Sequence, residues 1–312
     1  IKIFTGNYTF WYESSQLMAR QISDKNKKVE EKRQALLDFI ARFSANASKS
    51  KQATSRKKAL EKLTIEEIEP SNRKYPGIIF QPLREVGNQI LNVENLRQEV
   101  DGRVLFDKVS FSVNKGEKIA FLSKDPLAVT RFFETIEGSF PAAAGSFEWG
   151  TTITKAYLPQ ENSEFFAEGL TLMEWLRQFV PSHVTDADEP FLRGFLGKML
   201  FSGDDIMKKT NVLSGGEKVR CMLSRMMLQS PNLIILDQPT NHLDLESIQA
   251  FNDGCQMFPG IVLMTSHDHT FMQTVANRII ELTPKGIIDR LMTFDEYMED
   301  KRVKELREEM YA

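Results

Sequence analysis

The sequence predicts an α/β domain with a largely parallel sheet, preceded by an α-helical hairpin arm. Two observations lead to this prediction. From residue 91 onward, short runs rich in β-forming residues alternate with helical ones, as in parallel sheets covered by helices. Residues 13–66 are instead rich in Lys, Arg, Gln, Ser and Ala, and they contain neither glycine nor proline. The 312 residues therefore accommodate one large domain and an appendage.

The composition indicates a folded protein of a reducing compartment. Apolar residues make up 41% of the chain, enough for a sizeable core, and the net charge is only −3. No apolar run approaches the roughly 20 residues that span a bilayer, and residues 1–10 lack the pattern of a secretory signal. Cys221 and Cys255 show neither metal-binding nor redox spacing. We therefore expect a cytoplasmic protein in which both thiols are structural.

The appendage is predicted to be an antiparallel helical hairpin. Apolar residues recur at helical spacing between Leu36 and Phe43, and again from Ala59 to Leu63, on a charged background. We expect one helix over about 14–43, a turn at 44–48 and a second helix over about 49–63. Thirty helical residues would reach roughly 45 Å.

The tip of this hairpin is basic. Between residues 42 and 62, seven basic side chains face one acid, Glu61, which gives a local charge of +6. A solvated helix face is the ordinary explanation of such a run. The small and amide side chains between the charges favour contact with a nucleic-acid backbone instead, through phosphate neutralisation rather than base reading. The basic residues are Arg42, Lys49, Lys51, Arg56, Lys57, Lys58 and Lys62.

Four motifs follow one another in the larger domain, after a Pro- and Gly-rich segment at 67–90 that reads as a linker. Leu213-Ser214-Gly215-Gly216-Glu217 opens a helix that runs to Gln229, and Leu233–Asp237 is an apolar strand that ends in a carboxylate. Asn241-His242-Leu243-Asp244 comes next, and Thr265-Ser266-His267-Asp268 ends the following strand. Each motif alone is common, but chance does not explain the ordered set.

With these motifs the domain resembles an ATP-binding cassette of the ABC superfamily. The run DQPTNHLD (237–244) is similar to the form found in the ABC-F branch, and the hairpin sequence SANASKSKQATSRKKAL (44–60) resembles the YbiT-like group of that branch. The resemblance implies an ABC-type P-loop ATPase fold, with a mixed sheet and a helical subdomain. It also implies a chain with two cassettes, joined by a helical hairpin that contacts tRNA and the ribosome.

The resemblance assigns roles to the matching residues. Ser214, Gly215, Gly216 and Glu217 match the signature motif, which grips the γ-phosphate of ATP held by the opposite cassette. A serine cap on a helix N-terminus and two glycines suit an anion. Asp237 matches the carboxylate that holds Mg²⁺ through water, and Gln160 matches the ligand that senses Mg²⁺ and nucleotide. His267 matches the switch histidine, and Asp244 matches the loop that communicates across the cassette dimer.

The phosphate-binding loop departs from the family pattern. It should read G-x-x-x-x-G-K-[ST] between a strand and a helix. Here the expected strand 118–122 and helix 126–137 flank Ser123-Lys124-Asp125-Pro126-Leu127-Ala128-Val129-Thr130. Ser123 and Ala128 replace the glycines and Val129 replaces the lysine, so only Thr130 remains as a possible Mg²⁺ ligand.

Each of these changes weakens phosphate binding. Side chains at the glycine positions restrict the backbone that must wrap the phosphates. Pro126 removes one N–H donor and Asp125 adds a negative charge. Lys124 could replace the lost lysine only if the loop were rebuilt.

Two further losses affect the same nucleotide. The position expected to carry an aromatic side chain against adenine aligns with Val100. The catalytic glutamate is replaced by Gln238, and an amide cannot act as a general base. An engineered glutamine is the alternative to natural decay. The joint loss at one composite site favours decay.

The sequence therefore predicts a cassette that keeps its signature and has lost its own ATP site. Residues 1–12 resemble the segment that closes a preceding cassette, and the alternative is an unrelated N-terminal strand. We expect residues 13–66 to form the arm, 67–90 the linker and 91–312 the second cassette of an ABC-F ribosome-associated ATPase. ATP and Mg²⁺ would bind the first cassette, and this chain alone would be nearly inactive. A transporter ATPase subunit and a non-catalytic RNA-binding scaffold are the rival interpretations.

Overall fold

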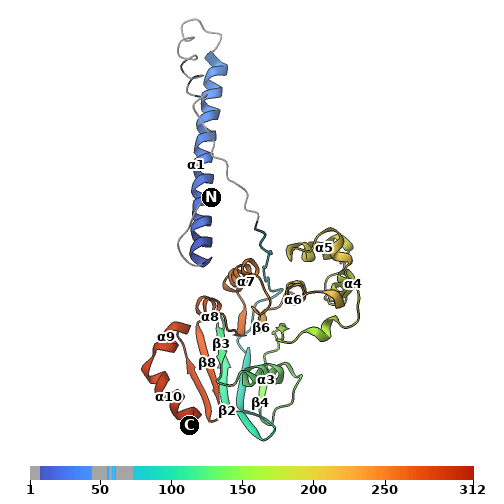
Figure 1. The fold of residues 1–312 in the computed structure, drawn as a ribbon, viewed down its shortest axis with the longest axis vertical. Coiled ribbons are helices and arrows are strands. Elements are labelled where there is room, and N and C mark those ends of the chain that lie inside the picture. Colours follow the sequence, from blue (N-terminus) through green and yellow to red (C-terminus); the bar gives the residue numbers. More distant parts are fainter. Residues whose placement is uncertain (1–7, 44–54, 56–57, 59, 61–72) are drawn as a thin grey trace. The chain divides into compact units, whose positions relative to one another are not determined.

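The computed structural model describes residues 8–43, 55, 58, 60 and 73–312 (Figure 1). The chain divides into two compact units, one up to Asn72 and one from Arg73 to Ala312. Within the described residues, no helix is long and apolar enough to cross a membrane.

The first unit contains one long helix, α1, at Tyr8–Phe43. It begins six residues earlier than the expected start at residue 14, so the alternative of an N-terminal strand is wrong for residues 8–12, and residues 1–7 lie outside the described residues. The reason is a helical spacing of aromatic rings, since Tyr8 lies 5.6 Å from Trp11 and 6.5 Å from Tyr12 between centroids. Ser55, Lys58 and Leu60 are helical, as predicted for the second helix. The rest of that helix and the turn at 44–48 lie outside the described residues.

The second unit is built on a six-stranded sheet in the order β5-β6-β7-β3-β8-β9. Five strands are parallel and only β9 runs antiparallel to its neighbour, β8, which confirms the predicted mixed, largely parallel sheet. The central strands are buried on both faces, as continuous apolar runs require. The strands are β3 (Lys118–Leu122), β5 (Lys155–Leu158), β6 (Leu233–Asp237), β7 (Ile261–Thr265), β8 (Arg278–Thr283) and β9 (Gly286–Arg290).

A smaller antiparallel sheet, in the order β2-β1-β4, covers one side of the main sheet. Helix α3 (Pro126–Glu137) packs between the two sheets, and its Phe132 and Phe133 are fully buried there. Phe132 stacks on Phe121 of β3 at 4.9 Å between ring centroids. The three strands are β1 (Leu91–Val100), β2 (Arg103–Val113) and β4 (Ala144–Trp149).

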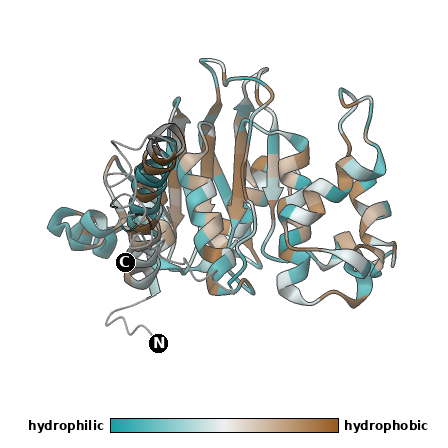
Figure 2. Cartoon of the chain, turned by 90° about the horizontal axis from the view of Figure 1, so that it is seen from above, coloured by the Kyte–Doolittle hydropathy of each residue, from teal (hydrophilic) through white to brown (hydrophobic). Residues whose placement is uncertain are grey.

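A second apolar core, in addition to the one between the two sheets, lies between the helices and the main sheet. Their apolar sides and the brown strands of Figure 2 meet inside the unit. α4 (Leu172–Arg177), α5 (Glu189–Lys198) and α6 (Gly215–Gln229) make the helical subdomain that the family resemblance implied. The remaining helices are α7 (Leu245–Met257), α8 (His269–Val275), α9 (Phe294–Glu299) and α10 (Lys301–Tyr311). Cys221 and Cys255 are buried in this core as free thiols, as expected of structural cysteines.

The segment expected as a linker packs on the cassette from residue 73 onward. It has no regular structure between residues 73 and 90, but Ile78 and Phe80 are buried in the helical core. Its Gly77 N–H donates to the Lys198 carbonyl at 2.7 Å. Proline and glycine therefore predicted the irregular backbone but not its attachment to the domain.

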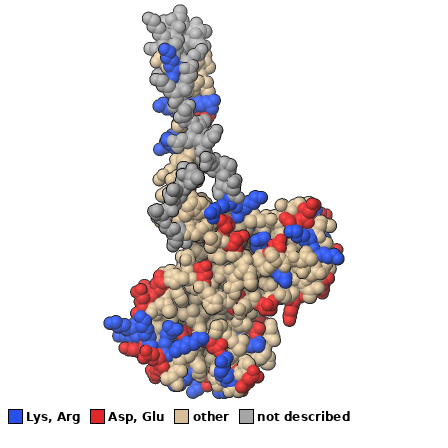
Figure 3. All heavy atoms as spheres, viewed as in Figure 1, with Lys and Arg blue, Asp and Glu red and all other residues tan. Residues whose placement is uncertain are grey.

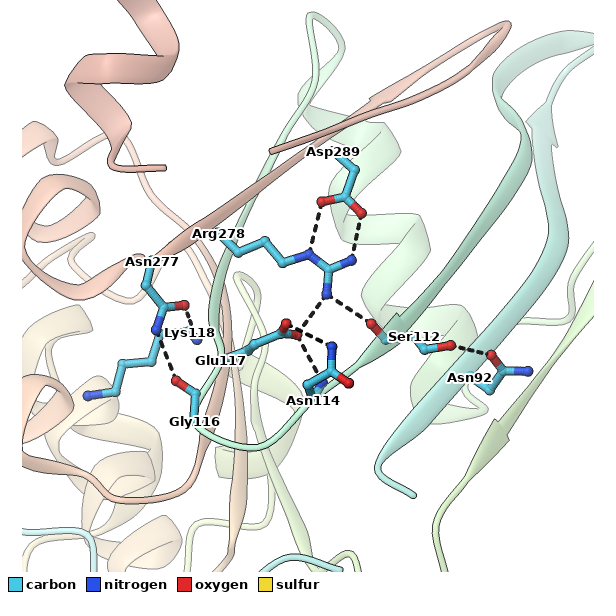
Figure 4. A network of polar contacts seen from close by, with 9 residues as sticks. All are labelled: Asn92, Ser112, Asn114, Gly116, Glu117, Lys118, Asn277, Arg278 and Asp289. Atoms are coloured by element: carbon cyan, nitrogen blue, oxygen red, sulfur yellow. Dashed lines mark hydrogen bonds and ion pairs between the residues drawn. The ribbon is translucent and has the colours of Figure 1, made fainter. Parts of the chain in front are cut away.

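A buried polar network joins the two sheets (Figure 4). The Arg278 guanidinium on β8 donates two hydrogen bonds to the Asp289 carboxylate, at 2.9 and 2.6 Å. It also donates to Glu117 at 2.7 Å and to the Ser112 carbonyl of β2 at 2.8 Å. Asn277 fixes the start of β3 nearby, because it accepts from the Lys118 N–H at 2.8 Å.

Candidate functional site

The loop between β3 and α3 satisfies its own backbone donors. An intact phosphate loop offers its N–H groups to an anion. Here four of them already bond to protein oxygens, and Pro126 has none to offer. The bonds are Lys124 N to the Tyr311 hydroxyl (2.9 Å), Asp125 N to Ser123 Oγ (3.3 Å), Leu127 N to Asp125 Oδ1 (3.1 Å) and Ala128 N to the Asp125 carbonyl (3.0 Å).

Asp125 supplies the anion at this helix end. It is the N-cap of α3, where a carboxylate is favoured by the free N–H groups and the helix dipole. Its other oxygen pairs with Arg103 of β2. A carboxylate of the chain itself therefore occupies the N-terminal end of α3.

The two substituted positions on α3 are part of the apolar core. Ala128 and Val129 are 0% and 2% exposed and pack between the two sheets. The valine cannot provide the charge that the missing lysine would. Lys124 does not replace it, because its ammonium lies 4.2 Å from the centroid of the Tyr311 ring.

Tyr311, on α10, holds the loop from the other side. Its hydroxyl donates to the Leu282 carbonyl at 3.0 Å while it accepts from the Lys124 N–H. Burial raises the pKa of Tyr311 to about 12, so the hydroxyl keeps its proton. Helix α10 is itself anchored by Glu281, which is fully buried and accepts from Arg307 at 3.0 Å. No local pattern in the sequence points to this tyrosine, because it lies 187 positions after Lys124.

Val100 lies at the end of β1, half-buried against the same apolar cluster. Its strand partner Arg103 lines an open cavity of about 430 Å³, together with Asp125 and Tyr311. No aromatic ring other than Tyr311 lines this cavity among the described residues. The position expected to carry an aromatic side chain against adenine has the aliphatic Val100, which does not line this cavity.

Asp237 and Thr130 form the part of the site that still suits a metal ion. Asp237 is 1% exposed, and neither of its carboxylate oxygens has a hydrogen-bond partner in the described chain. Burial raises its pKa to about 6, the Thr130 hydroxyl opposes this shift and the charge of Glu134 adds to it. An orphaned carboxylate beside a hydroxyl fits Mg²⁺, a hard cation that prefers oxygen. Gln160 is exposed just after β5 and has no polar contact with either residue.

Gln238 is turned toward the protein. It has a left-handed backbone, with φ of +51°, which is uncommon outside glycine. Its Oε1 accepts the backbone N–H of His267 at 3.1 Å, so the amide ties the end of β6 to the loop after β7. The His267 ring itself is exposed. Gln238 therefore uses its amide oxygen within the protein, and an amide is not a general base.

The signature motif has the opposite geometry. Ser214 caps α6 in a reciprocal capping box: Glu217 N donates to Ser214 Oγ at 3.3 Å, and Ser214 N donates back to Glu217 Oε2 at 2.9 Å. The N–H groups of Gly215 and Gly216 have no hydrogen-bond partner within residues 73–312. Ser214 and Gly215 are exposed. This helix end is open to an anion.

The loop after β6 packs directly on the signature. A Cβ atom at Gly216 would lie 2.6 Å from the His242 carbonyl oxygen, so only glycine fits there. Asp244 caps α7 by accepting the Ser247 N–H at 2.7 Å, and it lies 3.9 Å from Arg220 of α6. The two motifs that the resemblance assigned to the cassette interface are therefore one contiguous surface.

The predicted nucleic-acid residues are mostly outside the described part of the chain. Lys58 is helical and exposed. The side chain of Arg42 is not described, nor are Lys49, Lys51, Arg56 and Lys57. On the face of the cassette unit in Figure 3, basic and acidic side chains are interspersed. The basic tip thus stays a prediction.

Comparison with known sequences identifies the relatives of this chain. Two family models, both described as ABC transporter, match residues 1–80 and 106–241. The chain is 56% identical to the ABC transporter ATP-binding protein YkpA of Bacillus subtilis, over 100% of this chain and 57% of that protein. It is 35% identical to the probable ATP-binding protein YbiT of Escherichia coli O157:H7, over 97% and 57%. It is 30% identical to ABC transporter F family member 5 of Arabidopsis thaliana, over 99% and 45%.

Solved structures share the fold. The ATP-binding subunit of an ABC transporter superposes with a TM-score of 0.57 at 19% identity, over 71% of this chain and 99% of that one. A dimeric ATP-binding cassette in a post-hydrolysis state, bound to ADP and Pi, gives 0.56 at 16% identity, over 65% and 99%. The chain spans about half the length of the curated relatives it matches.

Proposed function

Because the chain belongs to the ABC-F family of ATP-binding proteins, we propose that it is the arm and second cassette of a two-cassette, ribosome-associated ATPase. In this proposal residues 1–12 end a first cassette, 13–66 form the arm and 67–90 lead into the cassette at 91–312. The relatives support it by their length, since this chain covers only 57% of YkpA and of YbiT.

The second cassette completes the ATP site of the first one. Ser214, Gly215 and Gly216 close over the γ-phosphate of ATP that the first cassette holds with Mg²⁺. The supporting observation is the contrast between two helix ends in one domain. At α3 the loop donors are bonded to Ser123, Asp125 and Tyr311, whereas at α6 the N–H groups of both glycines are open.

The chain's own site is degenerate and binds ATP weakly or not at all. If Mg²⁺ binds there, Asp237 and Thr130 hold it, and it would supply only neutralisation of phosphate charge. Gln238 cannot take a proton from water, and the ammonium of Lys124, the lysine of this loop, lies over the Tyr311 ring. Natural decay explains these losses together, because all of them serve one nucleotide.

In this cytoplasmic ATPase, the arm is the part that contacts RNA and moves with the ATPase cycle. Its basic tip, from Arg42 to Lys62, contacts the phosphate backbone of ribosomal RNA or tRNA. Closure of the two cassettes on ATP repositions the arm, and hydrolysis releases it. A transporter subunit would have no use for such an arm, and the F-family relatives favour the ribosomal role.

Matched substitutions in the two-cassette parent test the proposal. Ser214→Arg blocks the signature and should abolish ATP turnover. Thr130→Ala removes one of the two side chains proposed to hold Mg²⁺ at the degenerate site and should leave turnover within about twofold. Equal loss in both variants, or normal ATP turnover by the isolated 312-residue chain, would contradict the assignment of the working site.

Ribosome co-sedimentation tests the arm. The parent with Lys49, Lys51, Arg56, Lys57 and Lys58 changed to glutamine should bind ribosomes more weakly and with a smaller salt dependence, since each neutralised phosphate contact contributes to the salt slope. The control changes five exposed basic residues of the cassette to glutamine, namely Lys115, Arg177, Lys301, Arg302 and Lys304. Unchanged binding of the arm variant would contradict a phosphate-binding tip.

A further inference from the structure

Lys208 lies beside the signature on a fixed stretch of backbone. Its carbonyl accepts the Leu172 N–H at 3.1 Å, and an antiparallel bridge joins Thr171 to Lys209. Its ammonium is 2.7 Å from Asp205 Oδ1 and 3.4 Å from Glu217 Oε1. The lysine therefore reaches the carboxylate of the capping box from outside α6.

The Glu217 carboxylate opposes anion binding at the signature. Glu217 Oε2 accepts from both the backbone N–H and the hydroxyl of Ser214, each at 2.9 Å. Partial burial would raise the pKa of Glu217, but the bonds from Ser214 and the contact with Lys208 lower it overall. The negative charge of Glu217 thus lies 2.9 Å from the Ser214 hydroxyl, which in the proposed function meets the γ-phosphate, and like charges repel.

We propose that Lys208 is a positioning residue of the signature, which neutralises Glu217 so that Ser214 can turn its hydroxyl to the γ-phosphate of the opposite cassette's ATP. This inference rests on the proposed function of the signature.

The geometry explains why Glu217 needs a counter-ion when ATP binds at the signature. A serine hydroxyl has one proton to donate. In this structure the proton points to Glu217 Oε2, and on binding it must move to a phosphoryl oxygen. The carboxylate then loses the hydroxyl donor and keeps the Ser214 N–H, and Lys208 supplies the one cation within 4 Å of it in the part of the chain that the structure describes. Asp205 holds that ammonium in place from the other side.

Lys208 should matter for nucleotides with a γ-phosphate and not for those without one. The signature meets the terminal phosphate, so the repulsion from an unpaired Glu217 acts on ATP more than on ADP. Lys208 therefore favours binding of a nucleoside triphosphate over a nucleoside diphosphate at the signature.

The test uses the two-cassette parent and steady-state ATP hydrolysis. Lys208→Ala should raise the KM for ATP about two- to fivefold at low salt, the range expected of one charge at a helix end. The inhibition constant of ADP should change less than twofold. Lys208→Arg should restore the KM. Lys209→Ala is the matched control, because Lys209 is exposed and makes no ion pair in the described residues.

A double-mutant cycle separates this role from a structural one. Glu217→Gln keeps the capping box, in which glutamine serves as well as glutamate, but removes the charge. Lys208→Ala added to Glu217→Gln should then have no further effect on the KM. Additive effects, or an equal effect of Lys209→Ala, would overturn the inference.

The outcome also distinguishes the two proposals. If Ser214→Arg leaves ATP turnover intact, the proposed function fails. If Ser214→Arg abolishes turnover and Lys208→Ala changes nothing, only the role of Lys208 fails.

Discussion

Replacing Arg278 by leucine should destabilise the cassette more than any single surface change. The side chain is only 9% exposed, and its partners Glu117 and Asp289 are 11% and 29% exposed (Figure 4). Its pKa is raised, mainly by the hydrogen bonds with Asp289, so the guanidinium stays charged. Leucine fills part of the volume but leaves two carboxylates and the Ser112 carbonyl without this donor.

The expected loss of unfolding free energy depends on how much of the negative charge of Asp289 and Glu117 would stay uncompensated. Removing one partner of a buried ion pair costs about 3–5 kcal/mol. Asp289 is exposed enough to be rehydrated, and Glu117 keeps bonds from Asn114 at 2.9 and 3.0 Å. The lower end, about 3 kcal/mol, is therefore expected.

Urea unfolding of the 312-residue chain measures this cost through the fluorescence of its tryptophans. The matched control is Arg193→Leu, because Arg193 contacts Glu189 at 2.5 Å but both side chains are exposed, at 43% and 57%. An exposed pair of this kind contributes less than about 0.5 kcal/mol. If Arg278→Leu lowers the free energy of unfolding by less than about 1 kcal/mol, burial does not determine how much this network stabilises the cassette. That result would refute the reasoning.

Three further predictions concern the site. Asp237 has a folded pKa of about 6, above its unfolded value, so it costs stability that is absent below about pH 4 and fully developed above pH 6. Asp237→Asn in EDTA should therefore stabilise the chain by about 3 kcal/mol at pH 7 and by much less near pH 4 in urea titrations. Tyr311→Phe removes a hydroxyl bonded to two backbone groups and should cost about 1–2 kcal/mol by the same titration, with faster amide exchange at Lys124. Gly216→Ala should lower ATP turnover of the parent by displacing the His242 carbonyl, whereas Gly197→Ala, with open space around it, should not.

The sequence predicted the regular elements of the cassette closely. Strand 118–122, helix 126–137 and strand 233–237 have the predicted bounds. They are bounded by strong local signals, such as Pro126 at the first position of its helix and a carboxylate that ends an apolar run. Helix α1 begins six residues before the predicted start, because the resemblance of residues 1–12 to the end of a cassette separated them from the arm.

Contacts between distant parts of the chain could not be predicted. The bond between the Lys124 N–H and Tyr311 joins residues 187 positions apart. Local pattern showed that the loop had lost its glycines, but only the structure shows that an internal carboxylate and a tyrosine occupy its donors. The unpaired oxygens of Asp237 and the reach of Lys208 to Glu217 likewise depend on packing of separate elements.

Equilibrium dialysis of the isolated chain against labelled ATP and Mg²⁺ tests the central claim most directly. With its loop donors bonded to Ser123, Asp125 and Tyr311, the chain should show no saturable binding up to millimolar ATP. The parent should bind ATP at the first cassette, and Ser214→Arg should weaken that binding. One saturable site per isolated chain with a micromolar Kd, lost on Thr130→Ala, would contradict the account.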